Sequence, residues 1–339
     1  MEPADRSLRW SLAGTDPQGS LLEEAVDPTR ELREVEYLHV RARSVISEVP
    51  RASRMPFRYT INPYRGCSHA CTYCFARPTH EYLGLNGAED FEQRIVVKVN
   101  AVERLAAELA RPSWRGEHIA MGTNTDPYQQ AEGRYKLTRG IIETLGRARN
   151  PFSILSKSSM VLRDLDVLTA AAERTDVSMN FSIGTLDEEV WRRTEPGTPH
   201  PRARIEAIRT LTDAGIPTSV LMAPILPGIS DDPAQLRAVV EAALDAGATS
   251  ISPIMLHLRP GVREEFMPWL EATYPDLVPR YREAYTRPYG PKAERDRIGS
   301  VVRSMVGGRT KRRASSPGAS RFDRGWAAPR ETATQLPLF

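Results

Sequence analysis

Three cysteines, Cys67, Cys71 and Cys74, are the residues whose types and spacing most directly suggest chemistry. They are all the cysteines of this 339-residue chain, and they are separated by three residues and then by two. Thiolates so close along one loop can turn toward a single inorganic centre, and soft sulfur ligands select zinc, copper(I) or an iron–sulfur cluster. Structural zinc normally takes four protein ligands, whereas a cubane cluster takes a thiolate on each iron. The segment therefore predicts a four-iron cluster with one iron open to another molecule.

Two alternatives to the cluster stay open at this point. One is a Cys3His zinc site that uses His69 or His80 as its fourth ligand, because both lie close to the cysteines in the chain. The other is three cysteines that are simply buried.

The cysteine segment resembles a known family, the radical S-adenosylmethionine (SAM) enzymes. Their motif has this cysteine spacing with an aromatic residue just before the last cysteine, and Tyr73 fills that place. The resemblance implies that SAM chelates the open iron of a 4Fe-4S cluster. It also implies that an electron from the cluster cleaves SAM and releases a 5'-deoxyadenosyl radical. It also implies an electron donor such as flavodoxin or ferredoxin, and it makes Tyr73 a candidate SAM contact.

Composition indicates a globular protein. Hydrophobic residues make up 40% of the chain, and no run approaches the roughly 18 apolar residues that a membrane span needs. The first residues do not resemble a signal peptide. With no partner for a structural disulfide and an oxygen-labile cluster, we expect a cytoplasmic protein that does not bind membranes.

The order of expected elements indicates an α/β fold. Segments that resemble strands alternate for the most part with helical patterns, at residues 58–62, 118–123, 152–158, 177–184, 218–225 and 250–257. One helix is marked by Asp232 as N-cap, by Pro233 at its first position and by Gly247 beyond its end. This alternation predicts a parallel sheet with right-handed crossovers. The family resemblance, which covers residues from about 45 to 270, implies a partial (β/α)6 radical SAM barrel.

The ends of the chain differ in charge from the middle. Residues 1–37 carry nine acids and four bases, a net charge of −5, and residues 307–339 carry seven bases and two acids, a net charge of +5. Both ends are poor in periodic apolar residues, which is typical of flexible flanks. We therefore expect four parts: an acidic, partly disordered extension (1–44), the barrel (45–275), a C-terminal helical extension (276–306) and a basic disordered tail (307–339).

Candidate SAM contacts follow several of the expected strands, where parallel barrels build their sites. Residues 121–129 contain Thr123 and Asp126 among small polar side chains. The segment lacks the Gly-Gly-Glu type of turn common in the superfamily, but its Thr-Asp-Pro-Tyr run is similar to that of the spore photoproduct lyase branch. The alternative is a turn that needs no ligand.

Four further residues complete the candidate set. A lysine at the end of a buried strand is costly unless it meets an anion, and the resemblance places Lys157 near the SAM carboxylate. The same branch implies SAM contacts at Ser182, on the fourth strand, and at Glu195, which Arg204 could order as an ion pair. Ile229 follows the fifth strand in an apolar turn suited to the adenine face, or else belongs to the core.

The last residues suggest a partner. The final five residues, Gln335 to Phe339, are similar to the short motif with which bacterial polymerases and repair proteins dock on the sliding clamp. In such a motif Gln335 forms a hydrogen bond, and Leu336, Leu338 and Phe339 supply apolar anchors. Nearby Lys and Arg residues could hold DNA phosphates. The alternative is a solvated tail whose end packs against the body.

Three functions remain from the sequence alone. The first is a radical SAM enzyme that acts on damaged or modified DNA in DNA repair. The resemblance to the spore photoproduct lyase branch implies that this enzyme is a lyase. The second applies the same chemistry to a small metabolite, RNA or protein, with no DNA role, and the third is a regulator whose cluster senses redox state or iron. Spore photoproduct lyase is thought to return hydrogen from an additional cysteine, which this chain lacks, so Tyr128 or Tyr135 is the candidate hydrogen donor.

Overall fold

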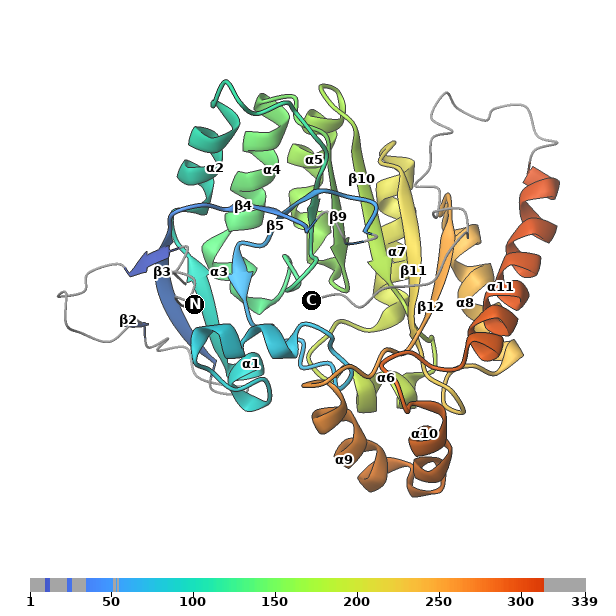
Figure 1. Ribbon diagram of the computed structural model, residues 1–339. Helices are drawn as coiled ribbons and strands as arrows, with labels where there is room; N and C mark the ends of the chain where they lie inside the picture. Colours follow the sequence, from blue (N-terminus) through green and yellow to red (C-terminus); the bar gives the residue numbers. More distant parts are fainter. Residues whose placement is uncertain (1–9, 13–22, 26–34, 51–52, 54, 314–339) are drawn as a thin grey trace.

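The computed structural model describes residues 10–12, 23–25, 35–50, 53 and 55–313. Its main element is a seven-stranded sheet in the order β12-β11-β10-β9-β8-β5-β4 (Figure 1). Six of these strands pair in parallel: β5 (Tyr59–Ile61), β8 (Ile119–Met121), β9 (Phe152–Ser156), β10 (Val177–Ser182), β11 (Thr218–Ile225) and β12 (Ile251–Met255). The short β4 (Ile46–Glu48) is antiparallel to β5. The six predicted strands, and the partial barrel that the family resemblance implied, are thus confirmed.

Helices between the strands cover the outer face of this sheet (Figure 1). They are α2 (Ala101–Leu109), α4 (Leu137–Arg147), α5 (Leu165–Ala172), α7 (Pro201–Asp213) and α8 (Pro233–Asp245). Alternate residues of β10 are buried, as Val177, Met179 and Phe181 show, because side chains of a strand point to its two faces in turn. Apolar side chains from strands and helices form one large core.

The ends of α8 follow the sequence prediction. The Asp232 carboxylate accepts hydrogen bonds from the backbone N–H groups of Ala234 and Gln235, at 2.8 and 3.4 Å. Pro233 is the first helical residue, where its missing N–H costs nothing. Gly247 lies beyond the helix with φ of +99°, a left-handed conformation that glycine adopts readily.

A second sheet lies beside the barrel and was not predicted. Its order is β1-β3-β7-β6, from β1 (Trp10–Leu12), β3 (Glu36–Ala42), β7 (Arg94–Lys98) and β6 (Tyr64–Arg65), and β2 (Glu23–Ala25) pairs with the other half of β3. The parallel pairing of β3 with β7 joins residues far apart in sequence, and β6 is antiparallel to β7 directly before the cysteines. The sheet therefore fixes the start of the cysteine segment. The segment predicted as an acidic extension, 1–44, contains β3, whose Leu38 and Val40 are buried.

Four short 3-10 helices and several α-helices complete the described chain. Those after the cysteines are η1 (Arg77–Thr79), η2 (Glu81–Leu83) and α1 (Glu89–Gln93), and η3 (Ser159–Asp164) follows β9. The crossovers also contain α3 (Gln130–Tyr135) and α6 (Glu188–Thr194), and the C-terminal part has α9 (Arg263–Thr273), η4 (Pro275–Leu277), α10 (Val278–Ala284) and α11 (Lys292–Arg313). In the described ranges, no helix is both long and apolar enough to cross a bilayer.

The long helix α11 packs against α8 and β12 and extends to Arg313. The basic tail was predicted to be disordered from residue 307, so its first residues, 307–313, differ from the prediction. The rest of the predicted tail, including the clamp-like residues Gln335, Leu336, Leu338 and Phe339, lies outside the described residues, and clamp docking stays a prediction.

Removal of the α8 cap should destabilise the fold. Asp232→Ala leaves the first N–H groups of the helix without their acceptor, so we expect a loss of about 1 kcal/mol in the free energy of unfolding. Urea denaturation followed by circular dichroism measures this loss. Asp213→Ala, at the last residue of α7, is the matched control because an acid at a helix C terminus caps nothing. Equal stability of both variants would contradict the assigned cap.

Candidate active site

The cysteine loop begins at a glycine that no other residue can replace without strain. Gly66 has φ of +77°, and a Cβ atom there would lie 2.8 Å from the carbonyl oxygen of Phe91. The next residue, Cys67, donates its backbone N–H to the same Phe91 oxygen at 2.8 Å. Cys67 and Cys71 are buried and Cys74 is partly exposed. The loop thus enters the barrel from β6 with two of its thiols directed inward.

A buried arginine holds the middle of the loop. Arg77 donates to the carbonyl oxygen of Cys71 from both Nε and Nη2, at 3.3 and 3.1 Å. Its guanidinium also bonds the carbonyl oxygens of Gly87 and Ala88 and forms an ion pair with Glu92. Because the planar guanidinium offers five donors, one side chain can connect the loop to the residues before α1.

The three thiols influence one another. Burial raises the pKa of Cys71 well above its usual range and that of Cys74 to about 11. Cys67 raises both pKa values further, and Cys74 also raises the pKa of Cys71. Neutral thiols have no reason to converge, and in the described part of the chain no three His, Cys, Asp or Glu side chains already form a metal-ligand set. The positive charge of a metal centre would convert the thiols to the thiolates that bind it.

The two histidines of the zinc alternative both contact other protein groups. His69 Nδ1 lies 3.4 Å from Asp126 Oδ2. Although burial opposes its charge, Asp126 and Cys67 raise the pKa of His69 to about 10, which favours the ion pair of its ring with Asp126. His80 Nε2 pairs with the carbonyl oxygen of Arg94 at 3.1 Å. His80 Nδ1 is buried and has no hydrogen-bond partner in the described residues. The three sulfurs of the loop match a cluster with one open iron.

The loop after β8 clamps the cysteine loop through a buried glutamine. Gln129 Oε1 accepts the backbone N–H of Ser68 at 3.0 Å, and its Nε2 donates to the carbonyl oxygen of Gly66 at 3.1 Å. Thr125 Oγ1 donates to the same oxygen at 2.6 Å. The predicted residue Thr123 accepts a bond from Asn62 Nδ2 at 3.1 Å, which ties this loop to the end of β5. These contacts connect the second strand end to the cysteines.

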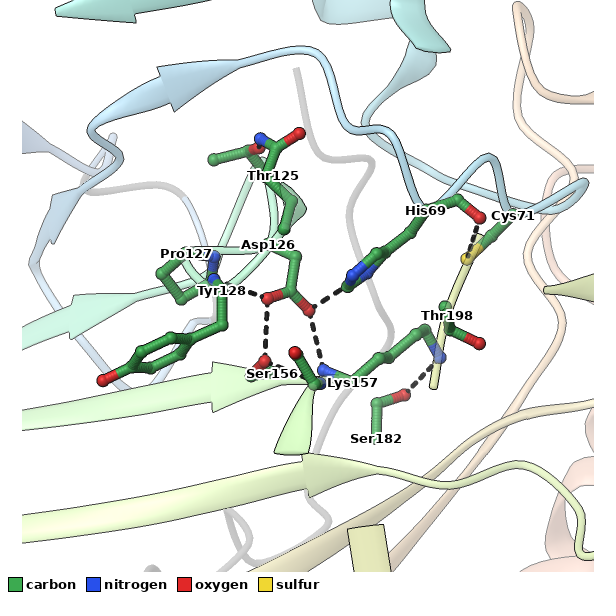
Figure 2. Close-up of polar contacts among 12 residues, drawn as sticks. His69, Cys71, Thr125, Asp126, Pro127, Tyr128, Ser156, Lys157, Ser182 and Thr198 are labelled. Carbon is green, nitrogen blue, oxygen red and sulfur yellow. Dashed lines mark hydrogen bonds and ion pairs between the residues drawn. The ribbon is translucent and has the colours of Figure 1, made fainter. Parts of the chain in front are cut away.

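Asp126, another predicted residue, joins three segments (Figure 2). Its Oδ1 accepts bonds from the Ser156 hydroxyl at 2.7 Å and the Tyr128 N–H at 2.9 Å. Its Oδ2 accepts the Lys157 N–H at 2.7 Å and faces the His69 ring. Both oxygens are committed to protein donors, so the structure gives Asp126 a role in positioning the cysteine loop against β9.

Five buried residues form one network, which we call the lysine–glutamate network. Its members are Tyr73, Lys157, Ser182, Glu195 and Arg204. Lys157 Nζ donates to Ser182 Oγ at 2.8 Å, as Figure 2 shows, and to Glu195 Oε1 at 2.9 Å. The Tyr73 hydroxyl also donates to Glu195 Oε1, and Arg204 pairs with Glu195 Oε2. The Lys157 ammonium lies 5.4 Å from the centroid of the Tyr73 ring. The structure thus unites five residues from four segments of the sequence.

The network carries more positive than negative charge. The side chains of Lys157, Glu195 and Arg204 are 14%, 6% and 1% exposed, and two cations share one carboxylate. Although burial favours the neutral acid, Arg204 and Lys157 hold the pKa of Glu195 well below its usual range. Arg204 Nε has no partner in the described residues. Buried charge is stable only when paired, so the network suits a second anion.

Other predicted residues lie elsewhere. Ile229 is buried in the turn after β11, and its contact with adenine stays a prediction. The Tyr135 hydroxyl bonds His39 Nε2 at 2.7 Å in the second sheet, and the Tyr128 ring points away from Lys157 (Figure 2). Neither tyrosine is directed at the network. Sequence reasoning missed Gln129 and Arg77, because their importance arises only from partners far along the chain.

Comparison with known proteins defines the class. The model of the Radical SAM superfamily matches residues 61–239. The chain therefore belongs to the radical SAM superfamily and is an enzyme of that class. Uncharacterized protein Rv2578c of Mycobacterium tuberculosis is 46% identical over 273 residues, which cover 80% of each chain. Uncharacterized protein MJ0683 of Methanocaldococcus jannaschii is 30% identical over 199 residues, covering 58% of this chain and 70% of that protein.

Solved structures of spore photoproduct lyase share the fold. A variant of that enzyme with bound AdoMet and dinucleoside spore photoproduct has a TM-score of 0.59 at 19% identity, covering 77% of this chain and 78% of its own. At this identity the likeness concerns the fold alone. The superfamily implies a 4Fe-4S cluster and SAM as cofactors, and the three sulfurs of the loop fit such a cluster.

A contact between the turn after α6 and the cysteine loop can be tested. A Cβ atom on Gly197 would lie 2.2 Å from the carbonyl oxygen of Ser68, so Gly197→Ala must displace the loop. We expect reconstituted Gly197→Ala to hold less iron per chain than the wild type, as measured by iron and sulfide analysis. Gly133→Ala is the matched control, because nothing lies within 4 Å of its added methyl group. Full iron content in Gly197→Ala would show that the loop tolerates the shift.

Proposed function

We propose that this chain binds SAM against the lysine–glutamate network and cleaves it reductively to a 5'-deoxyadenosyl radical that acts on damaged or modified DNA. The observation that carries the proposal is the excess positive charge of Lys157 and Arg204 over Glu195, buried beside the cysteine loop. The methionine carboxylate of SAM is an anion of the size and charge that this network lacks. The reduced cluster, when bound, supplies the electron that breaks the sulfonium bond.

Each residue of the network has a defined part in this proposal. Lys157 donates to the SAM carboxylate, and Ser182 holds the ammonium group of Lys157 in place through its hydroxyl, which in turn donates to the Ala223 carbonyl oxygen at 2.8 Å. Burial and then Glu195 raise the pKa of Tyr73 well above its usual range, so its hydroxyl stays protonated and donates to Glu195. Arg204 fixes Glu195 from the other side. Cys67, Cys71 and Cys74 hold the cluster. Thr123 and Ile229 are further candidate contacts of SAM.

Two observations support DNA as the substrate. Spore photoproduct lyase structures with the same fold contain a dinucleoside spore photoproduct. The C-terminal residues are similar to a sliding-clamp motif, which would bring the enzyme to DNA. A cytoplasmic location and an electron donor such as flavodoxin or ferredoxin agree with this proposal. The alternative is the same chemistry on a small metabolite, RNA or protein with no DNA role.

The role of Lys157 predicts a loss of SAM affinity on substitution. A hydrogen bond between charged groups contributes about 1.5–3 kcal/mol, so Lys157→Gln should weaken SAM binding about tenfold or more. Anaerobic isothermal titration of the reconstituted protein measures this change, with iron content as a check on the cluster. Lys292→Gln, which removes an exposed pair with Asp296 on α11, is the matched control. Unchanged affinity in Lys157→Gln would contradict the proposed carboxylate contact.

The substrate can be tested by isotope transfer. The anaerobically reconstituted enzyme is incubated with SAM, a reductant and ultraviolet-irradiated DNA in which thymine carries deuterium. We expect deuterium in 5'-deoxyadenosine, because the radical abstracts hydrogen from its substrate, together with a loss of the lesion by mass spectrometry. Non-irradiated DNA and Cys71→Ser are the controls. Production of unlabelled 5'-deoxyadenosine with every lesion intact would remove DNA as the substrate and favour the alternative.

A further inference from the structure

The segment after β12 packs against the cysteine loop at the carboxyl end of the barrel. This segment connects β12 to α9, which lies below the strands in Figure 1. Gly261 has φ of +79°, and a Cβ atom there would lie 2.5 Å from Pro78 Cγ in η1. Arg259 Nη2 donates to the carbonyl oxygen of Phe75, the residue that follows Cys74. Side chains of the last strand end thus lie directly beside the least buried of the three cysteines.

Rings and guanidinium groups gather at this junction. We call them the ring–guanidinium surface: Phe75, Tyr82, His257, Arg259, Tyr289 and Arg295. Phe75 and Tyr82 are 50% and 78% exposed, which is unusual for large apolar rings beside a buried site. The Arg259 guanidinium lies 6.0 Å from the Phe75 ring centroid.

The other members extend the surface from Arg259. The rings of His257 and Tyr289 meet edge to face at 4.5 Å, and the two residues form an isolated β-bridge. Arg295 lies 5.8 Å from the Tyr289 ring centroid. Ring and cation contacts thus join Phe75 to Arg259 and His257 through Tyr289 to Arg295. Tyr82 and Tyr289 lie close enough to Arg259 to influence its charge.

Among the described residues, no carboxylate forms an ion pair with Arg259. Burial lowers the pKa of Arg259, and the groups that oppose this shift are Cys74, Tyr82 and Tyr289, with no carboxylate among them. Its Nε is buried and has no hydrogen-bond partner in the described residues. Burial, and then Arg295 and Arg259, lower the pKa of His257 to about 4, so its ring is neutral at pH 7. A desolvated guanidinium with an unused donor is suited to a phosphate oxygen.

We propose that the ring–guanidinium surface binds one unstacked nucleotide of single-stranded DNA and presents its base to the radical site. This inference rests on the proposed function, since it names the surface through which the DNA substrate would reach the cluster. Aromatic faces and arginine planes stack on bases of any sequence, and an enzyme that acts on a base must take it out of the duplex. Phe75 and Tyr82 supply exposed faces, and Arg259 supplies the phosphate contact.

Fluorescence anisotropy tests this surface with a short fluorescein-labelled oligodeoxythymidylate and the anaerobically reconstituted full chain. Because stacking contributes about 1–3 kcal/mol per base, Phe75→Leu and Tyr82→Leu should each weaken binding about fivefold or more. Both substitutions keep an apolar side chain, so the loop beside Cys74 stays packed. Arg259→Gln should also weaken binding and should reduce the salt slope of log K by about 0.7, as expected for one lost phosphate contact on a single strand.

The control is Arg58→Gln, because the Arg58 guanidinium also lies over a ring, 5.5 Å from the Tyr59 centroid, at the amino end of β5. It should leave affinity and salt slope unchanged. Equal loss in the control, or wild-type affinity in Phe75→Leu and Arg259→Gln, overturns the inference. Slower reduction by flavodoxin with unchanged DNA affinity would assign the surface to the electron donor and overturn it as well. A separate assay without DNA measures whether the dithionite-reduced wild-type enzyme cleaves SAM. It tests the proposed SAM chemistry independently of the ring–guanidinium surface.

Discussion

Glu195 and the two cations that share it impose the strongest constraint on this structure. Taking charges out of water costs several kcal/mol each, and one carboxylate cannot fully compensate two cations in the interior. The fold offsets part of this cost with further bonds: Arg204 donates to the Ser182 and Pro199 carbonyl oxygens, at 2.9 and 3.0 Å. The charge that remains is an excess of one cation. Such a surplus is costly in a protein core unless a ligand completes it.

The rest of the barrel brings this network to the cysteines. Asp126 couples the loop after β8 to β9 and faces His69, while Gln129 bonds the cysteine loop on both sides of Cys67. The residues after α6 close the other side, where the Thr72 N–H donates to the Thr194 carbonyl oxygen at 3.0 Å. Four consecutive strand ends therefore meet at one place. This is where parallel barrels build their sites.

Sequence patterns predicted the parts of the structure that depend on local chemistry. Asp232, Pro233 and Gly247 mark the ends of α8 because capping acts within a few residues. Lys157 could be placed at a strand end because the run before it predicts a buried strand, and the two-residue period of strands predicted the face on which Ser182 lies. The second sheet could not be predicted, because β3 is stabilised by pairing with β7, which lies beyond the cysteine segment in the chain. Gln129 and Arg77 were missed for the same reason, since a buried polar side chain gives no local signal of its partner.

The central claim is that one iron of the cluster is left free by the protein and binds SAM beside Lys157 and Glu195. The most direct measurement is the electron paramagnetic resonance spectrum of the anaerobically reconstituted, reduced protein before and after SAM is added. The account predicts a 4Fe-4S signal whose g values change when SAM binds. Protein that carries zinc instead, or a cluster whose spectrum is the same with and without SAM, would contradict it.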